Sequence, residues 1–272
     1  MKVALCLMGI VGAVEEKYGL GESIDYRIGH HFIKKHILDK NDVDVFIHSW
    51  STEFKDKLVD IYKPKKYLIE QQIDFGERSL RFQSLKSRWY SNKKVVELKS
   101  EYEKENNFKY DFVMIYRLDC MFNKDVIFSE FDNEYFYNSH INECGDPGPS
   151  NPSDYNNHCH CAGYGAYADL WFFGNSDDIN LFGTLCDSWD EYGIESPHKV
   201  IIHHLNEMGL GSKLKHEFCD RYDHYPVRCY FTNCEYTNEE FDVTKLKPFN
   251  SIHDGYGKRT HTQDRIIERN NE

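Results

Sequence analysis

The sequence predicts an α/β fold in which helices flank a mostly parallel central sheet. Two observations support this prediction. Short, uninterrupted apolar runs recur along the chain, and such runs are typical of strands buried on both faces of a parallel sheet. Between them lie stretches whose apolar residues recur at helical spacing. Strands that alternate with helices build a parallel sheet, because parallel neighbours need a long crossover connection.

Four apolar runs in the first half of the chain predict strands. The first run ends at Gly9 and Gly12, which suit a tight turn because glycine adopts backbone angles that other residues avoid. A helical pattern from Ile24 to Ile37 follows, and residues 79–106 are charged and rich in helix formers. The four predicted strands are Val3–Met8, Asp44–His48, Lys66–Glu70 and Asp111–Tyr116.

The second half of the chain predicts shorter elements. Tyr135–Tyr137 and Leu170–Phe173 have the composition of short strands. Between them, residues 142–165 are rich in Gly, Pro, Asn and Ser and predict a long loop, which usually has a functional reason. Asn175–Trp189 predicts a single helix with Asn175 as its N-cap. A further helix is predicted from Ser196 to Met208.

No internal repeat and no second core is apparent. The chain therefore predicts one Rossmann-like domain over residues 1–245 and a polar extension over residues 246–272. The formal net charge is −12, from 33 Lys and Arg against 45 Asp and Glu. This balance argues against nucleic acid as a partner, because phosphate neutralisation needs a basic surface. A small phosphorylated ligand would need local arginines or lysines, or a bound divalent cation.

The longest apolar run and the cysteines bear on location. Residues 3–14 form an apolar run that is too short to cross a bilayer, so no transmembrane segment is expected. Its length also fits the apolar region of a signal peptide, but Gly9 and Gly12 favour a strand that ends in a turn. The nine cysteines are odd in number and irregularly spaced, which favours free thiols in the cytoplasm over a disulfide framework.

Arg117 and Asp119 are the strongest candidates for a site. Residues two apart in an extended chain point to the same side, so both side chains would project together from the end of a predicted inner strand. Ligands of open α/β sheets bind at the carboxyl ends of the strands. The same spacing would also arise in a structural ion pair.

Five segments of the chain, in this order, carry a resemblance to a known family. They are KVALCLMGIVG at Lys2–Gly12, DVFIHSW at Asp44–Trp50, YKPKKYLIE at Tyr62–Glu70, YDFVMIYRLDCMF at Tyr110–Phe122 and DLWFFGNSDDINLF at Asp169–Phe182. Together they resemble nucleotide-sugar glycosyltransferases of the GT-A type, found in viral and bacterial gene sets for surface glycans. The resemblance implies a GT-A-like domain that transfers a sugar from a UDP- or GDP-linked donor to a glycan or glycoprotein acceptor.

The resemblance also implies a metal site. Asp119 corresponds to the last acid of the DxD motif, with which GT-A enzymes hold Mn²⁺ or Mg²⁺ against the donor diphosphate. Arg117 stands where the first Asp would be, so metal dependence is left open. Arg117 would instead contact the ribose or phosphates as a bidentate fork. A late histidine often completes the metal site of GT-A enzymes, which implies His253 or His261 as a ligand.

Further donor contacts are expected at the first turn and on the long helix. Without side chains, the glycines of the turn would let backbone N–H groups approach the nucleotide. A tryptophan after the second strand could stack on a base or sugar, although core packing would also explain it. The helix cations would contact the diphosphate or else remain solvated. The predicted donor-binding residues are Gly9, Ile10, Gly12, Trp50, Arg88, Lys94 and Arg117.

Asp169 is the predicted general base. It would remove the proton of the acceptor hydroxyl that attacks the anomeric carbon. The alternative role for an Asp before a strand is to cap a turn. The run His158-Cys159-His160-Cys161 offers metal-ligand types, but adjacent side chains converge poorly on one tetrahedral ion.

Two other classes of function compete with a glycosyltransferase. A metal-dependent hydrolase or phosphoesterase would use the abundant Asp and His residues, but it needs a cluster of ligands for two ions. A non-catalytic carbohydrate-binding module would use the 19 Tyr, 18 Phe and 4 Trp, but has no need for an Arg-Asp pair at a strand end.

Overall fold

The computed structural model describes residues 1–13, 22–77, 79–140, 169–193, 197–219 and 223–248. Short 3-10 turns at Leu38–Lys40, Thr52–Phe54, Phe128–Glu130, Gly211–Lys213 and Val243–Lys245 connect some of its elements. The strands are β1 (Val3–Gly9), β2 (Val43–Ser49), β3 (Lys66–Ile69), β4 (Phe112–Arg117), β5 (Cys120–Phe122), β6 (Phe136–His140), β7 (Trp171–Gly174), β8 (Leu214–Cys219) and β9 (His224–Pro226). The helices are α1 (Tyr26–His36), α2 (Lys55–Tyr62), α3 (Leu80–Asn106), α6 (Ser176–Gly183), α7 (Leu185–Tyr192), α8 (Pro197–Glu207) and α9 (Val227–Tyr230).

A seven-stranded sheet in the order β3-β2-β1-β4-β7-β6-β8 forms the middle layer. β1 pairs in parallel with both β2 and β4, and β3 pairs in parallel with β2. β7 runs antiparallel to its two neighbours, β4 and β6, while β8 runs parallel to β6. The prediction of an α/β fold with a mostly parallel sheet flanked by helices is confirmed, and the arrangement is compatible with a Rossmann-like fold. The finer GT-A assignment stays a prediction.

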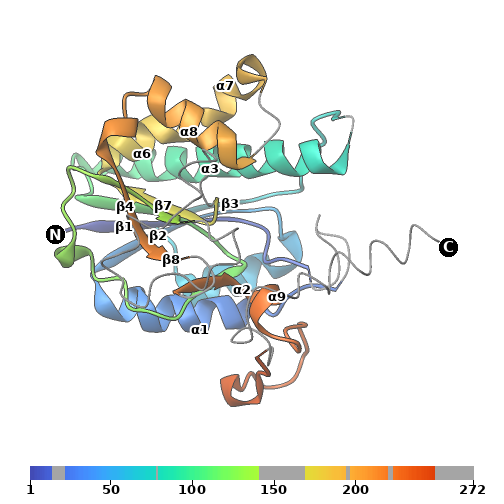
Figure 1. Ribbon diagram of the computed structural model, residues 1–272. Coiled ribbons are helices and arrows are strands. Elements are labelled where there is room, and N and C mark those ends of the chain that lie inside the picture. The colour runs from blue at the N-terminus through green and yellow to red at the C-terminus, as the bar shows by residue number, and fades with distance from the viewer. Residues whose placement is uncertain (14–21, 78, 141–168, 194–196, 220–222, 249–272) are drawn as a thin grey trace.

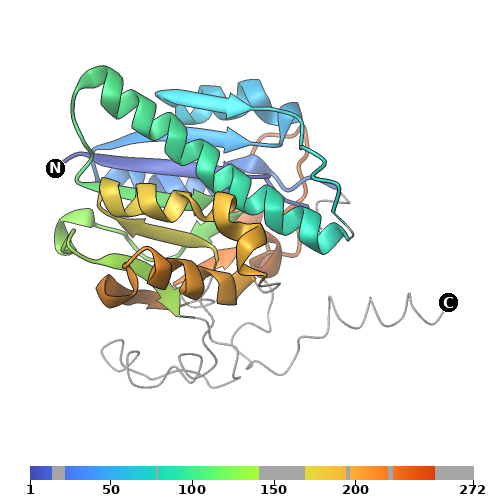
Figure 2. The same ribbon diagram turned by 90° about the horizontal axis from the view of Figure 1, so that it is seen from above.

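Helices cover both faces of the sheet (Figure 1). α1 and α2 lie on one face, and α3, α6, α7 and α8 lie on the other, where α3 crosses the strands (Figure 2). β1 is apolar throughout because both of its faces are buried. Leu5 and Leu7 belong to the core under α1, whereas Cys6 and Met8 belong to the core under α3. Successive side chains of a strand point to opposite faces, so a strand covered on both faces has no polar positions.

The long helix α3 is fastened to the neighbouring helix α6 by a buried lysine. Lys99 is fully buried, and its Nζ lies 2.9 Å from Glu103 Oε2 on the next turn. The same ammonium group donates to Ser176 Oγ and Asn180 Oδ1, each at 2.7 Å. A buried charge needs a partner and satisfied hydrogen bonds, and Lys99 has both. This contact fixes α3, which carries Arg88, relative to α6.

The prediction of a single helix over Asn175–Trp189 is wrong, because the structure has two helices there. Asn175 does cap it, accepting the Asp178 N–H at 2.9 Å, but the helix ends at Gly183 and a second one, α7, begins at Leu185. Gly183 packs so closely on α3 that an added Cβ would lie 3.1 Å from Val96 Cγ1. The Thr184 hydroxyl donates to the Leu181 carbonyl at 2.7 Å, in competition with the helical backbone.

The other predicted elements are found near their predicted bounds, while α2, α9, β5, β8 and β9 were not predicted. The predicted loop at residues 142–165, its His158–Cys161 run, and both His253 and His261 lie outside the described residues.

At the predicted end of the domain, Leu246 packs against the core. The Thr232 N–H donates to the Lys247 carbonyl at 2.9 Å. The division between residues 1–245 and 246–272 stays a prediction.

Candidate functional site

The carboxyl ends of β1 and β4 form the point at which the strand order changes direction. From β1 the chain passes to β2 and β3 on one side, and then returns to β4 on the other side. In open α/β sheets such a switch point leaves a crevice outside the carboxyl ends, and ligands bind there. The Gly9–Gly12 turn begins at the last residue of β1. Arg117 is the last residue of β4 and Asp119 follows it, so the structure brings both predicted segments to this point.

The glycine turn lies directly against Asp119. Gly9 and Gly12 have φ angles of +92° and +111°, in the left-handed region that favours glycine. A Cβ added to Gly12 would lie 2.7 Å from Ile24 Cδ1 and 3.0 Å from Asp119 Cβ, so only glycine allows this approach. The Gly9 and Val11 N–H groups donate to the hydroxyls of Ser91 and Ser51. Those two N–H groups therefore hold the turn in place. Donor contact by Gly9, Ile10 and Gly12 stays a prediction.

Arg117 and Asp119 form a bidentate ion pair. Arg117 Nε donates to Asp119 Oδ1 at 2.8 Å, and Nη2 donates to Oδ2 at 2.6 Å. A third residue joins them, because Arg228 Nη1 donates to Asp119 Oδ2 at 3.0 Å. Asp119 is 2% exposed, while the arginine side chains keep 20% and 25% of their surface exposed. The carboxylate is thus the buried centre, and the two arginine side chains that bind it are partly exposed.

The two arginines determine the charge of Asp119. Burial by itself would raise the pKa of Asp119, but Arg117 and Arg228 outweigh burial and hold that pKa below its ordinary value. Burial opposes the charge of Arg117, yet Asp119 outweighs it, and the pKa of Arg117 lies well above its ordinary value. Asp119 and Arg117 are therefore both ionised near neutral pH.

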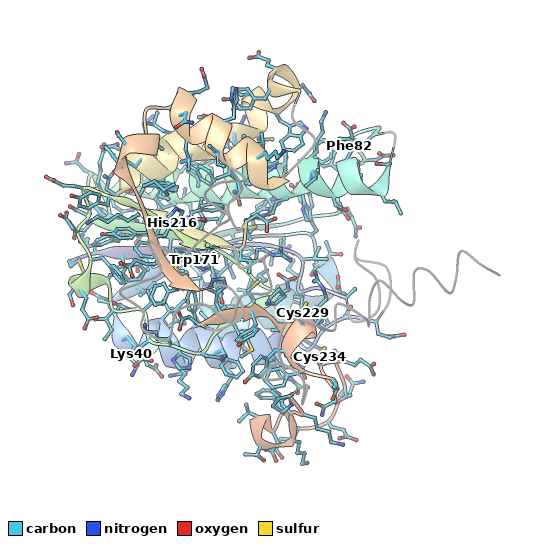
Figure 3. All side chains as sticks on the ribbon, viewed as in Figure 1. Lys40, Phe82, Trp171, His216, Cys229 and Cys234 are labelled. Carbon is cyan, nitrogen blue, oxygen red and sulfur yellow. The ribbon has the colours of Figure 1, made fainter. Side chains whose placement is uncertain are left out.

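Arg228 reaches Asp119 from a distant part of the chain. β5, directly after Asp119, pairs antiparallel with β9, and α9 follows β9. The Val227 N–H donates to the Asp119 carbonyl at 2.8 Å, which places the start of α9 beside the ion pair. Figure 3 shows Cys229, the residue after Arg228, on the side of the sheet that α1 covers. No sequence signal would have found Arg228, since 109 residues separate it from Asp119.

Arg88 belongs to the same cluster. Its Nη1 donates to Asn92 Oδ1 at 2.6 Å, and its Nη2 donates to the Asp169 carbonyl. Burial lowers the pKa of Arg88 to about 9, with Arg117 adding to this effect and the charge of Asp169 opposing it. Arg88 therefore keeps its positive charge near neutral pH in surroundings that do not fully compensate it. The prediction that Arg88 lies at the site is consistent with these contacts.

Asp169 lies between the two arginines from β4 and α3. Its carbonyl accepts the Arg88 hydrogen bond, and its negative charge acts on both Arg88 and Arg117. The next residue, Leu170, accepts the Arg117 N–H at 3.3 Å and leads into β7. These contacts bring the predicted base to the cluster, although they do not test its role in proton transfer.

Trp50 and Lys94 have no contact with Arg117 or Asp119 among the described residues, although the Trp50 backbone N–H donates to the Gly9 carbonyl at 3.2 Å. Trp50 follows β2, two strands away from β4, is 7% exposed, and stacks on Tyr90 with ring centroids 5.5 Å apart. Lys94 pairs with Glu97 at 2.7 Å and lies over the Tyr90 ring. The contacts of both residues are those of a core aromatic and a helix-surface cation. Their predicted contact with a nucleotide remains untested.

The oxygen atoms available around Asp119 do not fit the binding of a divalent metal ion. Each carboxylate oxygen already accepts two hydrogen bonds: Oδ1 from Arg117 and from Cys120 Sγ at 3.6 Å, and Oδ2 from Arg117 and Arg228. Mn²⁺ or Mg²⁺ commonly binds through one or two carboxylates together with waters and substrate phosphates, so it needs a carboxylate oxygen that is free to coordinate it. Within the described ranges, no group of three or more His, Cys, Asp or Glu side chains could hold a metal ion.

No protein-family model matches the chain, and no curated protein matches it either. Membership of the GT-A family therefore stays a prediction from the five resembling segments. Among the described residues, no helix is both long enough and apolar enough to cross a membrane.

Proposed function

We propose that the protein is a glycosyltransferase that moves a sugar from a nucleoside-diphosphate donor, UDP- or GDP-linked, to a glycan or glycoprotein acceptor. One observation carries the proposal: Arg117 and Arg228 bind Asp119 at the switch point of the sheet, beside a glycine turn, and the charge of Arg88 acts on the same group. Arginine binds phosphate oxygens through two parallel N–H groups, which suits a diphosphate. The family resemblance of the segments that carry Gly12, Arg117 and Asp169 supports the same function.

In the proposed reaction, the bond between the anomeric carbon and the donor phosphate oxygen breaks, and the acceptor oxygen bonds to that carbon. Negative charge grows on the departing nucleoside diphosphate, and fixed positive groups stabilise it without reorganising. Arg88 and Arg117 would supply those groups, with Asp119 holding Arg117 in one orientation. Asp169 would accept the proton of the acceptor hydroxyl. Because the described residues do not fit a divalent metal ion, no step is assigned to one.

The proposed location is the cytoplasm. Free thiols are found at Cys6, Cys120, Cys186, Cys229 and Cys234 among the described residues. A reducing compartment keeps thiols free, so these side chains support the proposal.

Thermal unfolding of the full chain with UDP, GDP and CDP tests the function. A ligand that binds only the folded state raises the melting temperature; at 100-fold over its dissociation constant it adds about 2.7 kcal/mol. We expect one of the three nucleotides to stabilise the protein, and Arg117→Gln to remove most of that shift. Arg27→Gln is the matched control, since Arg27 forms the same bidentate fork with Asp25 at the start of α1.

Outcomes of three measurements would contradict the proposal: the same unfolding with nucleotides, unfolding with free sugars, and an assay of phosphate release. Stabilisation by free sugars with none by any nucleotide would favour a carbohydrate-binding module. Release of free phosphate from a phosphorylated substrate, without an acceptor, would favour a hydrolase or phosphoesterase. An equal loss of the nucleotide shift in Arg117→Gln and Arg27→Gln would indicate general destabilisation and not a binding site.

A further inference from the structure

The Asp119 carboxylate is already fully used within the protein. Its two oxygens accept from Arg117 Nε and Nη2, from Arg228 Nη1 and from Cys120 Sγ. A divalent ion would have to displace these groups, and would then lie beside two guanidinium groups. Repulsion between like charges at such short range is strongly unfavourable in a partly buried site. Asp119 therefore orients Arg117 and Arg228, and its carboxylate is not free to bind a metal ion.

The cluster carries an excess of positive charge. In the described part of the chain, the charged groups that act on one another here are three arginines, Arg88, Arg117 and Arg228, and two carboxylates, Asp119 and Asp169. Arg117 and Arg228 share the Asp119 carboxylate, while Arg88 donates to an amide oxygen, a backbone carbonyl and the Met8 sulfur. One guanidinium group is thus left without a carboxylate bonded to it, which favours the binding of an anion.

Two buried donors at Arg88 have no acceptor. Arg88 Nε and Asn92 Nδ2 are both buried and lack a hydrogen-bond partner among the described residues. The Asn92 side chain is 2% exposed, and its Oδ1 accepts from Arg88, so its amide group cannot turn without losing that bond. A buried donor without an acceptor costs free energy, which a ligand oxygen would recover. Phosphate oxygens are acceptors of the right kind.

We infer that Arg88, Arg117, Arg228 and Asn92 bind the diphosphate of the donor without a divalent metal ion. The inference rests on the proposed function, and adds to it the source of positive charge and two binding residues, Arg228 and Asn92. The arginines neutralise the phosphates, and Asp119 keeps two of them in place. Asn92 donates its free amide N–H to a phosphate oxygen. Binding of the nucleoside diphosphate is then independent of Mn²⁺ and Mg²⁺.

Isothermal titration calorimetry of the full chain with UDP, GDP and CDP tests the inference, once in excess EDTA and once in Mn²⁺. We expect the preferred nucleotide to bind in EDTA with a dissociation constant within about threefold of that in Mn²⁺. Binding that appears only with Mn²⁺, or tightens more than about tenfold with it, would overturn the inference and leave the proposed function standing. Absence of binding under both conditions would overturn both.

Two variants locate the site in the EDTA titration. Arg228→Gln should weaken binding about tenfold, the usual loss for one hydrogen bond to a charged group, and Arg27→Gln should leave it unchanged. Asn92→Ala should weaken binding by a similar factor, and the control is Asn106→Ala at the exposed end of the same helix. Full affinity in both Arg228→Gln and Asn92→Ala would contradict the inference. If a variant fails to fold, far-ultraviolet circular dichroism shows it, and the conservative Arg228→Lys or Asn92→Ser takes its place.

Discussion

Asp119 combines near-complete burial with contacts to two arginines, and this combination sets its response to pH. Its carboxylate is 2% exposed, and Arg117 and Arg228 hold its pKa below the ordinary value of 3.8. A group whose pKa is lower in the folded state stabilises the fold above its ordinary pKa. That stabilisation is lost as the pH falls through the lower, folded-state pKa. Below that range the protonated carboxyl leaves both guanidinium groups without their partner.

We expect Asp119→Asn to destabilise the protein most near neutral pH, by about 3 kcal/mol, because it removes one partner of a buried ion pair. The difference from the wild type should shrink as the pH falls below about 4, where the wild-type carboxylate also loses its charge. Urea unfolding at several pH values measures this difference. The control Asp60→Asn, on the exposed surface of α2, should change stability little at any pH. A constant difference for Asp119→Asn across the pH range would contradict the account.

The sequence could predict the Arg117–Asp119 pair because both residues lie on one strand end, two positions apart. It could not predict Arg228, which arrives through the β5–β9 pairing. Asn92 gave no signal either, since a polar residue on a long charged helix is usually solvated. The sequence could therefore predict Arg117 and Asp119, which are close neighbours in the chain. Arg228 and Asn92 join them only through the tertiary structure.

The Gly9–Gly12 turn is the element on which the proposed site depends most. Gly12 touches both Ile24, just before α1, and Asp119, just after β4. Gly29, within α1, comes so close to the β4–β5 turn that an added Cβ would lie 2.7 Å from the Leu118 carbonyl oxygen. Two glycines thus let β1, α1 and the Arg117–Asp119 segment pack together without side chains between them.

Gly12→Ala should therefore destabilise the fold and disturb the ion pair. The substitution places a Cβ at a φ of +111° and into contact with Ile24 and Asp119, so we expect a loss of about 2–4 kcal/mol. Gly76→Ala is the matched control, because Gly76 also has a positive φ, +68°, but has nothing within 4 Å of an added Cβ. Gly76→Ala should lower the free energy of unfolding by about 1 kcal/mol, through backbone strain alone. Chemical unfolding of both variants checks this, and equal losses would mean that the close packing at Gly12 contributes nothing.

At the level of elements, prediction succeeded where a strand is buried on both faces. The runs at β1 and β4 are apolar without interruption, because each face of the sheet has its own core. β5 and β9 were missed because each has only three residues, too few to show a pattern. β8 has the sequence LKHEFC, which mixes charged and apolar residues as an outer strand can. The break between α6 and α7 depends on contact of Gly183 with α3, which the local sequence does not reveal.

At the scale of the whole molecule, the proposed site lies at one end of the sheet, where the inner strands have their carboxyl ends. Two helical layers bury both faces, so the carboxyl ends of the inner strands are where side chains can meet a ligand (Figure 1). β1 and β4 meet there at the switch point, with α3 supplying Arg88 and α9 supplying Arg228. The protein carries a net charge of −12, so this local group of arginines would attract an anion against an unfavourable overall field. The order of elements predicted this end of the sheet. The metal ion that the family resemblance implies finds no fitting group of ligands among the described residues.

A crystal structure of the full chain with the nucleoside diphosphate that stabilises it most tests the central claim directly. We expect the diphosphate oxygens within hydrogen-bond distance of Arg88, Arg117 or Arg228, at the carboxyl ends of β1 and β4. A nucleotide bound in any other part of the molecule, with the arginine cluster unchanged and free of phosphate, would contradict the account.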